Sequence, residues 1–290
     1  MAAPLPICYL DGEYQSLADA RISPLDRGFL FADSVYEVLP VFDGRPYRFT
    51  EHFDRLARSL RETRIPSPHS HAAWLEILNG LTARNGARTF YAYVQVSRGM
   101  EYGRNHAFPE SVKPTVFAMC SPLPELTREH REHGLSAITV EDFRWGRCDI
   151  KSTMLLANVL MKQAASEAGA NEAIIVSNGQ VLEGASTSVF VVKGETVVTP
   201  PDGHRILPGT TRDAALELVQ ANLTTQIRPI NVDELLYADE IWISAATRDV
   251  LPITKLNGLP VGKGRPGPLW QMMTELFAQD RKRLAGTPPA

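Results

Sequence analysis

Arg147-Cys148-Asp149-Ile150-Lys151-Ser152-Thr153-Met154 is the stretch around which the chain is organised. Before it, residues 136–145 alternate β-branched or aromatic residues with polar ones, which is typical of a half-buried strand. After it, apolar residues follow at helical spacing, and Ser152 or Thr153 is placed to cap the helix. Lys151 is therefore expected at a helix N-terminus, where the partial positive charge favours the neutral amine that a Schiff-base lysine needs. Taken alone, an ordinary surface lysine is the commoner interpretation.

The composition is that of an ordinary globular protein. The 290 residues are 44% hydrophobic and 22% charged, with a formal net charge of -3, so neither nucleic acid nor a membrane is an expected partner. No apolar run reaches the length of a membrane span, and the N-terminus lacks a signal-peptide pattern. Cys8, Cys120 and Cys148 have no zinc-binding spacing, so no metal site is expected. They are interpreted as reduced thiols of a cytoplasmic protein, with a Cys120–Cys148 disulfide left open.

Residues 1–120 are predicted to form a small N-terminal α/β domain. Asp11-Gly12 and Asp43-Gly44 are expected as the turns of two hairpins. Thr50 is expected to cap a helix over residues 51–62 that buries apolar side chains on one face. The other elements expected here are a helix at 72–83 and strands at 90–97 and 114–120.

Residues 121–127 contain two prolines in a polar setting and are the predicted linker to a larger C-terminal domain, residues 128–290. Strands are expected there at 172–177, 180–183, 188–193, 196–199 and 240–244, and helices at 212–221 and 268–284. Because regular crossover helices do not separate these strands, the pattern favours a barrel-like or sandwich domain over a doubly wound sheet. The chain is therefore expected to belong to the α+β class.

Several polar residues could form a binding site, although each is a weak signal alone. Gly209–Asp213 opens a helix and could bind phosphate, or Thr210 could simply begin a capping box. Glu183 ends an apolar strand and could pair with a buried ring nitrogen, or lie exposed in a turn. Arg104 and His106 could hold a small carboxylate, or belong to a solvated loop.

In combination, five motifs resemble those of the fold-type IV pyridoxal-phosphate enzymes, the branched-chain and D-amino-acid aminotransferase family. The motifs are RGFLFADSVYEV at 27–38, HFDRL at 52–56, CDIKS at 148–152, LEGASTSVF at 182–190 and GTTRD at 209–213. They follow the family's order over nearly the whole chain, and the likeness is greatest to its D-amino-acid transaminases.

The resemblance implies a fold of a small N-terminal α/β domain and a larger barrel-like domain, and a transaminase that uses pyridoxal 5′-phosphate (PLP), cycling with pyridoxamine 5′-phosphate. It would transfer the amino group of D-alanine and other D-amino acids to 2-oxoglutarate or other α-keto acids. Lys151 would be the catalytic Schiff-base lysine, and Glu183 would keep the ring nitrogen protonated. The other cofactor-binding residues that it implies are Arg55, Thr210, Thr211 and Thr247 at the phosphate, Thr187 nearby, and Leu207 on the ring face.

The resemblance also implies how the substrate is held. Its α-carboxylate would bind Tyr36, Arg104 and His106, and the last two would come from the partner subunit of an obligate homodimer. Glu37 and Arg147 would form a pair that orients Lys151.

Two positions depart from the family pattern, and other activities stay open. The segment Arg98–Arg104 holds one residue more than is typical, which leaves the substrate range open, and Ala246 replaces a usual hydroxyl residue. The alternatives with the same cofactor are a branched-chain L-amino-acid transaminase, an R-amine transaminase and a 4-amino-4-deoxychorismate lyase. A non-catalytic binding protein on the same scaffold is a further alternative.

Overall fold

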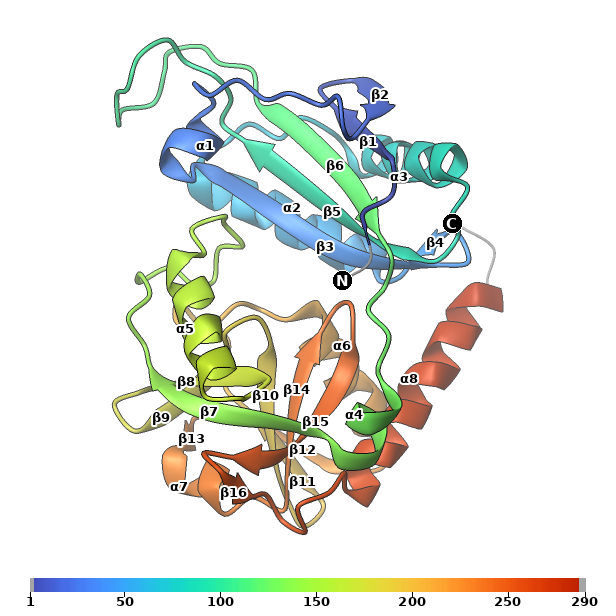
Figure 1. The fold of residues 1–290 in the computed structure, drawn as a ribbon, viewed down its shortest axis with the longest axis vertical. Coiled ribbons are helices and arrows are strands. Elements are labelled where there is room, and N and C mark those ends of the chain that lie inside the picture. The colour runs from blue at the N-terminus through green and yellow to red at the C-terminus, as the bar shows by residue number, and fades with distance from the viewer. Residues whose placement is uncertain (1–2, 287–290) are drawn as a thin grey trace. The chain divides into compact units, whose positions relative to one another are not determined.

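The computed structural model describes residues 3–286, and the chain divides into two compact units (Figure 1). The first contains the chain up to Pro124 together with Ile150–Met154, and the second contains Glu125–Asp149 and Leu155–Arg283. The boundary at Pro124 lies within the segment expected as a linker. No helix in the described residues is long and apolar enough to cross a membrane.

The first unit is built on a six-stranded antiparallel sheet in the order β2-β1-β6-β5-β3-β4. Both predicted hairpins are present, with Asp11 and Asp43 at positive φ in their turns. The elements are β1 (Ile7–Leu10), β2 (Glu13–Ser16), α1 (Arg27–Phe31), β3 (Ser34–Phe42), β4 (Arg45–Pro46), α2 (Phe49–Thr63), α3 (His71–Asn85), β5 (Phe90–Ser97) and β6 (Thr115–Ser121).

Helices α2 and α3 cover one face of this sheet, behind it in the view of Figure 1. Phe53, Leu56 and Leu60 of α2 are buried there, as their spacing predicts. The alternation of β3 sends Leu39 toward this core, while Tyr36 belongs to the other set of positions.

One predicted cap in this unit is wrong. Helix α2 begins at Phe49, so Thr50 lies inside its first turn, and the N-cap is Arg48 in a left-handed conformation without a side-chain cap. The capping signal of Thr50 failed because only two residues separate β4 from the start of α2 at Phe49.

The second unit contains a ten-stranded mixed sheet that curls into a half-barrel. Its main path is β12-β11-β10-β14-β15-β7-β8-β9-β13, with β16 paired to β15. The elements are α4 (Arg128–His133), β7 (Leu135–Glu141), α5 (Leu156–Glu167), β8 (Glu172–Ser177), β9 (Gln180–Gly184), β10 (Ser188–Lys193), β11 (Thr196–Thr199), α6 (Thr210–Val219), β12 (Thr224–Ile227), β13 (Ile230–Asn231), α7 (Val232–Leu236), β14 (Glu240–Ala245), β15 (Asp249–Leu256), β16 (Leu259–Pro260) and α8 (Pro268–Gly286).

Both faces of the half-barrel are buried, which explains its nearly continuous apolar strands. In β10, Val189 and Val191 point into one core, whereas Phe190 and Val192 belong to a second core with residues of α6 and α8. A third cluster packs Met161 of α5 with neighbouring strand residues. The predicted α+β class and barrel-like second domain are confirmed.

The three cysteines are free thiols, which closes the open question of a Cys120–Cys148 bond. Burial raises the pKa of Cys120 to about 12. Burial is also the main cause that raises the pKa of Cys148 to about 11.

Candidate active site

Lys151 lies on the extended segment Ile150–Met154, which belongs to the first unit. The backbone N–H of Tyr36 donates to the carbonyl of Lys151 at 2.9 Å, and Ser152 forms a β-bridge with Val35. The side-chain Nζ of Lys151 lies 4.4 Å from the centroid of the Tyr36 ring, within the range of a cation–π contact. The structure thus brings together two predicted site residues from distant parts of the sequence.

The helix that the sequence predicts next to Lys151 starts later than expected. Helix α5 begins at Leu156, and neither Ser152 nor Thr153 is its cap. The hydroxyl of Thr153 lies 2.5 Å from that of Ser34 and donates to the carbonyl of Ala32 at 3.2 Å. The prediction that Lys151 lies at a helix N-terminus is therefore wrong. Pairing with β3 positions the lysine, and it also groups Lys151 with the first unit instead of the C-terminal domain.

Behind Tyr36, on the α2 face of the sheet, Glu37 forms a buried network with α2. Arg55 donates to both carboxylate oxygens, from Nε at 2.7 Å and from a terminal nitrogen at 2.8 Å, and His52 Nδ1 lies 2.8 Å from Oε2. Burial alone would raise the pKa of Glu37, but the Arg55 charge and the hydrogen bonds from Arg55 and His52 lower it to about 2. Burial lowers the pKa of His52 against the opposing effect of Glu37. Glu37 is therefore an anion at neutral pH.

Substituting Glu37→Gln is expected to lower the free energy of unfolding by about 3–5 kcal/mol at pH 7, because it leaves the buried Arg55 without its carboxylate. The pKa of Glu37 in the fold, about 2, is below its ordinary value of 4.5. Its charge therefore stabilises the fold above that ordinary value, and this contribution is lost as the pH falls through the folded pKa. Urea unfolding at pH 7 and pH 3 measures the effect, which should be smaller at pH 3. Equal stability of wild type and variant at pH 7 would contradict it, and exposed Glu13→Gln is the control.

Arg104 and His106 lie on the loop between β5 and β6, and both are exposed. The guanidinium carbon of Arg104 is 5.1 Å from the centroid of the Phe31 ring, and the centroid of the His106 ring is 5.2 Å from it. Within residues 3–286 Arg104 has no carboxylate partner. The two predicted carboxylate-binding residues therefore stand together around one aromatic ring.

In the second unit, Glu183 is buried at the end of β9 and held from two sides. Arg144 donates to its Oε1, and the backbone N–H of Leu207 donates to Oε2 at 3.1 Å. Arg144 is itself bound by Asp142 at 2.9 Å, and although burial opposes it, the Asp142 and Glu183 carboxylates raise the pKa of Arg144. This arrangement keeps a carboxylate in a fixed position, as pairing with a ring nitrogen requires.

Other predicted residues of this unit have partners of their own. Thr187 donates to Glu172 at 3.4 Å, and Arg147 binds Asp149 through Nε at 3.0 Å. Glu37 and Arg147, predicted to pair with each other, thus each have a partner within their own unit.

The turn at Gly209 has the features of a phosphate site. Helix α6 begins at Thr210, so Gly209 is the N-cap and the alternative of a capping box from Thr210 is wrong. A Cβ on Gly209 would lie 2.5 Å from the hydroxyl of Ser188 and 3.0 Å from Cβ of Arg212, so a larger residue here would displace these side chains. Ser188 pairs across the sheet with Ser244, whose buried hydroxyl has no hydrogen-bond partner in the described part of the chain. A helix N-terminus with an unsatisfied hydroxyl nearby suits a bound phosphate.

Thr211 is the second residue of α6. Thr247 lies in the turn that follows β14, the strand that contains Ser244. Both are partly buried, and so is Leu207. The second unit thus holds Thr210 and Thr211 at the start of α6 and Thr247 in the turn after β14.

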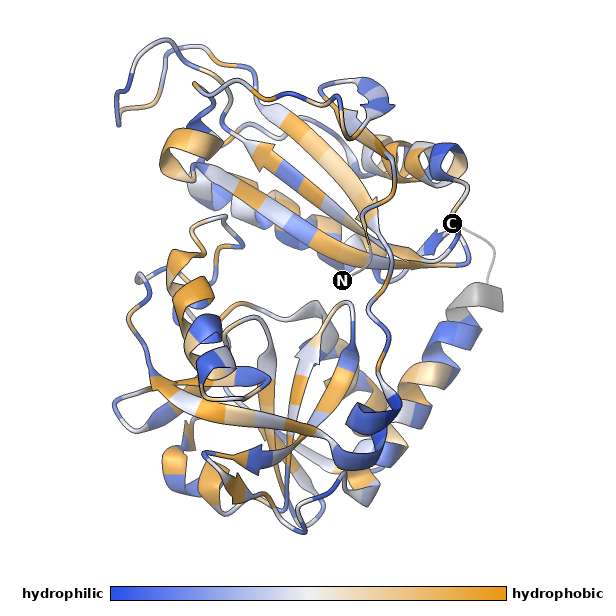
Figure 2. Cartoon of the chain, in the orientation of Figure 1, coloured by the Kyte–Doolittle hydropathy of each residue, from blue (hydrophilic) through white to orange (hydrophobic). Residues whose placement is uncertain are grey.

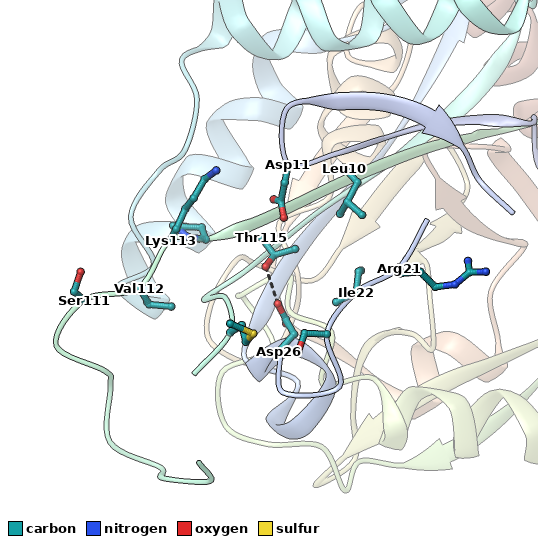
Figure 3. Close-up of a pocket in the computed structure, with 12 residues that line it drawn as sticks. Leu10, Asp11, Arg21, Ile22, Asp26, Ser111, Val112, Lys113 and Thr115 are labelled. Atoms are coloured by element: carbon teal, nitrogen blue, oxygen red, sulfur yellow. Dashed lines mark hydrogen bonds between the residues drawn. The ribbon is translucent and has the colours of Figure 1, made fainter. Parts of the chain in front are cut away.

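A pocket of about 430 Å³ lies elsewhere in the first unit, at the base of the β5–β6 loop (Figure 3). Its buried carboxylate, Asp26, accepts hydrogen bonds from Thr115 at 2.7 Å and from Ser97 at 2.9 Å. None of the predicted site residues lines it. Asp26 serves the fold here, since its oxygens are already satisfied by neighbouring hydroxyls.

Four residues of the site environment were not found by sequence reasoning: Arg27, His52, Ser59 and Arg144. Ser59 accepts a hydrogen bond from the backbone N–H of Lys151 at 3.3 Å. Arg144 lies in the stretch expected as a strand, although β7 ends at Glu141. For Arg144 the available signal was the pair Asp142-x-Arg144 directly after an apolar strand, whereas Arg27 and His52 each begin a quoted motif that assigned them no role. In the described residues no cluster of His, Cys, Asp or Glu could hold a metal ion.

The half-barrel sheet, the buried Glu183 and the helix N-terminus at Gly209 are compatible with a PLP-dependent aminotransferase. Residues 34–256 match the family described as amino-transferase class IV, and the chain belongs to this family. The D-alanine aminotransferase of Bacillus licheniformis is 39% identical over 260 residues, which cover 89% of this chain and 91% of the relative.

Two solved structures have the same fold. The branched-chain amino acid aminotransferase of Escherichia coli has a TM-score of 0.88 and 25% identity, covering 95% of this chain and 94% of that chain. A hypothetical aminotransferase from Mycobacterium tuberculosis, in a PLP-bound form, has a TM-score of 0.82 and 26% identity, covering 93% and 96%. The predicted family, enzyme class and PLP cofactor are thereby confirmed.

Proposed function

We propose that this enzyme is a D-amino-acid transaminase that moves the amino group of D-alanine and other D-amino acids to 2-oxoglutarate or another α-keto acid. The observation that carries the proposal is that Arg104 and His106 lie together around Phe31, and we infer that they bind the α-carboxylate of the substrate. The D-alanine aminotransferase relative at 39% identity supports the same substrate class.

The residues that would hold PLP fit its chemistry. Lys151 would bind its aldehyde carbon, Glu183 its ring nitrogen, and Leu207 its ring face. The phosphate would be bound by Arg55, Thr210, Thr211 and Thr247, with Thr187 nearby. The Ser244 hydroxyl, which has no hydrogen-bond partner in the described residues, and the helix N-terminus at Gly209 support the phosphate assignment. When bound, PLP supplies an electron sink for the substrate α-carbon.

The protein's own groups then have distinct tasks. Lys151 Nζ would accept the proton from the substrate α-carbon. Its backbone pairing with β3 limits the positions that Nζ can reach, and Tyr36 lies under it. Arg104 and His106 bind the carboxylate and thereby fix which face of the α-carbon meets the base.

We also propose a homodimer in which Arg104 and His106 come from the partner subunit. Helix α5 supports the dimer, because its first turns are hydrophobic (Figure 2) yet exposed. Leu156, Val159 and Leu160 share one face and are 73%, 58% and 52% exposed, opposite the face that buries Met161. An apolar face of this kind usually marks an interface.

The three free cysteines support a cytoplasmic location.

The double substitution Val159→Asp with Leu160→Asp is expected to convert the dimer to monomers, because it places two charges in the apolar contact. Sedimentation velocity measures the mass of each species. Ser166→Asp, which adds one charge at an exposed position of the same helix, should stay dimeric. A double variant that remains dimeric would exclude α5 from the interface.

The visible absorbance of the PLP-loaded enzyme tests the reaction. D-Alanine should bleach it and 2-oxoglutarate should restore it. Bleaching by L-leucine in place of D-alanine would favour a branched-chain transaminase, the second candidate, which the Escherichia coli structure supports. Bleaching only by an aromatic R-amine would point to an amine transaminase.

A further inference from the structure

Arg27, at the start of α1, is buried and binds the loop that carries Arg104 and His106. Its side chain is 4% exposed and donates to the carbonyls of Asn105 at 2.7 Å, His106 at 3.3 Å and Ala107 at 3.3 Å. Its backbone N–H donates to the carbonyl of Gly99 at 2.9 Å. One arginine therefore holds both ends of the segment around Arg104.

Two carboxylates keep Arg27 in place and balance its charge. Asp33 accepts from Nε at 2.9 Å, and Glu101 of the same loop accepts from a terminal nitrogen at 3.0 Å. Asp33 also binds Arg98, at 2.7 and 3.0 Å, and Arg98 donates onward to the carbonyl of Thr63 at 2.8 Å. The Arg98 guanidinium and the Arg27 charge lower the pKa of Asp33 against the effect of its burial, so Asp33 is an anion at neutral pH.

The charges around Phe31 are divided unequally. The guanidinium carbons of Arg27 and Arg104 lie 4.8 Å and 5.1 Å from its ring centroid. Arg27 is neutralised by Asp33 and Glu101, whereas Arg104 has no carboxylate partner within residues 3–286. The positive charge available to an anion at this ring is therefore that of Arg104.

We propose that Arg27 is a positioning residue for the substrate carboxylate, and that Glu101 completes its anchor from within the loop. Arg27 acts through the loop backbone: its planar fork binds three successive carbonyls and so presets the positions of Arg104 and His106. Lysine at this position keeps the charge but cannot span the same acceptors. This inference rests on the proposed role of Arg104 and His106.

The experiment compares the PLP-loaded enzyme with Arg27→Lys, Glu101→Ala and Arg104→Ala, with the exposed Arg21→Lys as the matched control. Hydrogen exchange of the amides of residues 101–107 measures the anchoring without any turnover. Steady-state kinetics give kcat and the KM values for D-alanine and 2-oxoglutarate. Both substrates carry an α-carboxylate, so both KM values should change together.

Loss of these hydrogen bonds should raise both KM values about tenfold in Arg27→Lys and about threefold in Glu101→Ala, with kcat within about twofold. Amide exchange of residues 101–107 should accelerate in both variants and stay unchanged in Arg21→Lys. If Arg27→Lys does not fold, the half-buried Glu101→Ala decides the matter alone.

Unchanged KM values in Arg27→Lys and Glu101→Ala, alongside a raised KM in Arg104→Ala, would overturn the inference and leave the proposed function standing. A lower kcat with unchanged KM values in Arg27→Lys and Glu101→Ala would also overturn the inference, because the loop would then not act through substrate binding. Unchanged KM values in Arg104→Ala would overturn the proposed function itself, while hydrogen exchange would still report the anchor.

Discussion

Lys151→Ala should reduce amino-group transfer by a factor of about 10⁴ or more, because it removes both the covalent attachment of PLP and the base for the α-proton. The substitution leaves the backbone pairing with Tyr36 in place, since that bond uses the Lys151 carbonyl. Turnover of D-alanine and the visible absorbance of bound PLP are the two measurements. Circular dichroism and thermal unfolding should stay close to those of the wild type.

Lys193→Ala is the matched control for this result. Lys193 is an exposed lysine on β10 that pairs with Asp239 at 2.9 Å, and such a surface pair contributes little. It should retain full activity. Substantial transamination by Lys151→Ala would remove Lys151 from the centre of the proposal.

Glu183→Gln should lower kcat about 100-fold, because a neutral amide no longer stabilises a protonated ring nitrogen. Glutamine keeps the size of the side chain and an oxygen that can accept from the Leu207 N–H. The KM for D-alanine should change far less than kcat, since the carboxylate of the substrate is bound elsewhere. The visible spectrum of bound PLP should also shift, which a purely structural defect would not explain.

Glu195→Gln, at an exposed position of the turn before β11, is the control and should be silent. Thermal unfolding of Glu183→Gln is needed beside it, because Arg144 loses one of its two anions. If kcat stays within a few-fold of wild type in a folded Glu183→Gln, the ring-nitrogen role is excluded.

Local sequence signals predicted much of the fold. The Asp11-Gly12 and Asp43-Gly44 turns could be predicted because a two-residue hairpin depends on residues that tolerate positive φ. The barrel-like second domain could be predicted because most of its strands follow one another without a helix between them, although α5 and α6 connect the parallel pairs β7–β8 and β11–β12. The start of α5 could not, since Thr153 uses its hydroxyl on Ser34 and Ala32 instead of a helix end.

The site was predictable where a motif marks it and not where burial decides. Glu183 lies in the motif LEGASTSVF and Gly209 begins the motif GTTRD, so the sequence marks both residues. Arg27 begins a quoted motif and Arg144 follows an apolar strand, but neither pattern indicates burial, and arginines are mostly exposed. Only the fold shows that both are buried against carboxylates, so their part in the site could not be read from their neighbours in the chain.

The docking of Ile150–Met154 against β3 sets an order on folding during synthesis. The chain up to Pro124 is synthesised before Ile150–Met154, the segment that pairs with Val35 and Tyr36. Helix α4 and strand β7 must emerge in between. A fragment that ends at Pro124 would therefore lack the segment that pairs with β3, and Lys151 joins its unit only after synthesis of the second unit has begun.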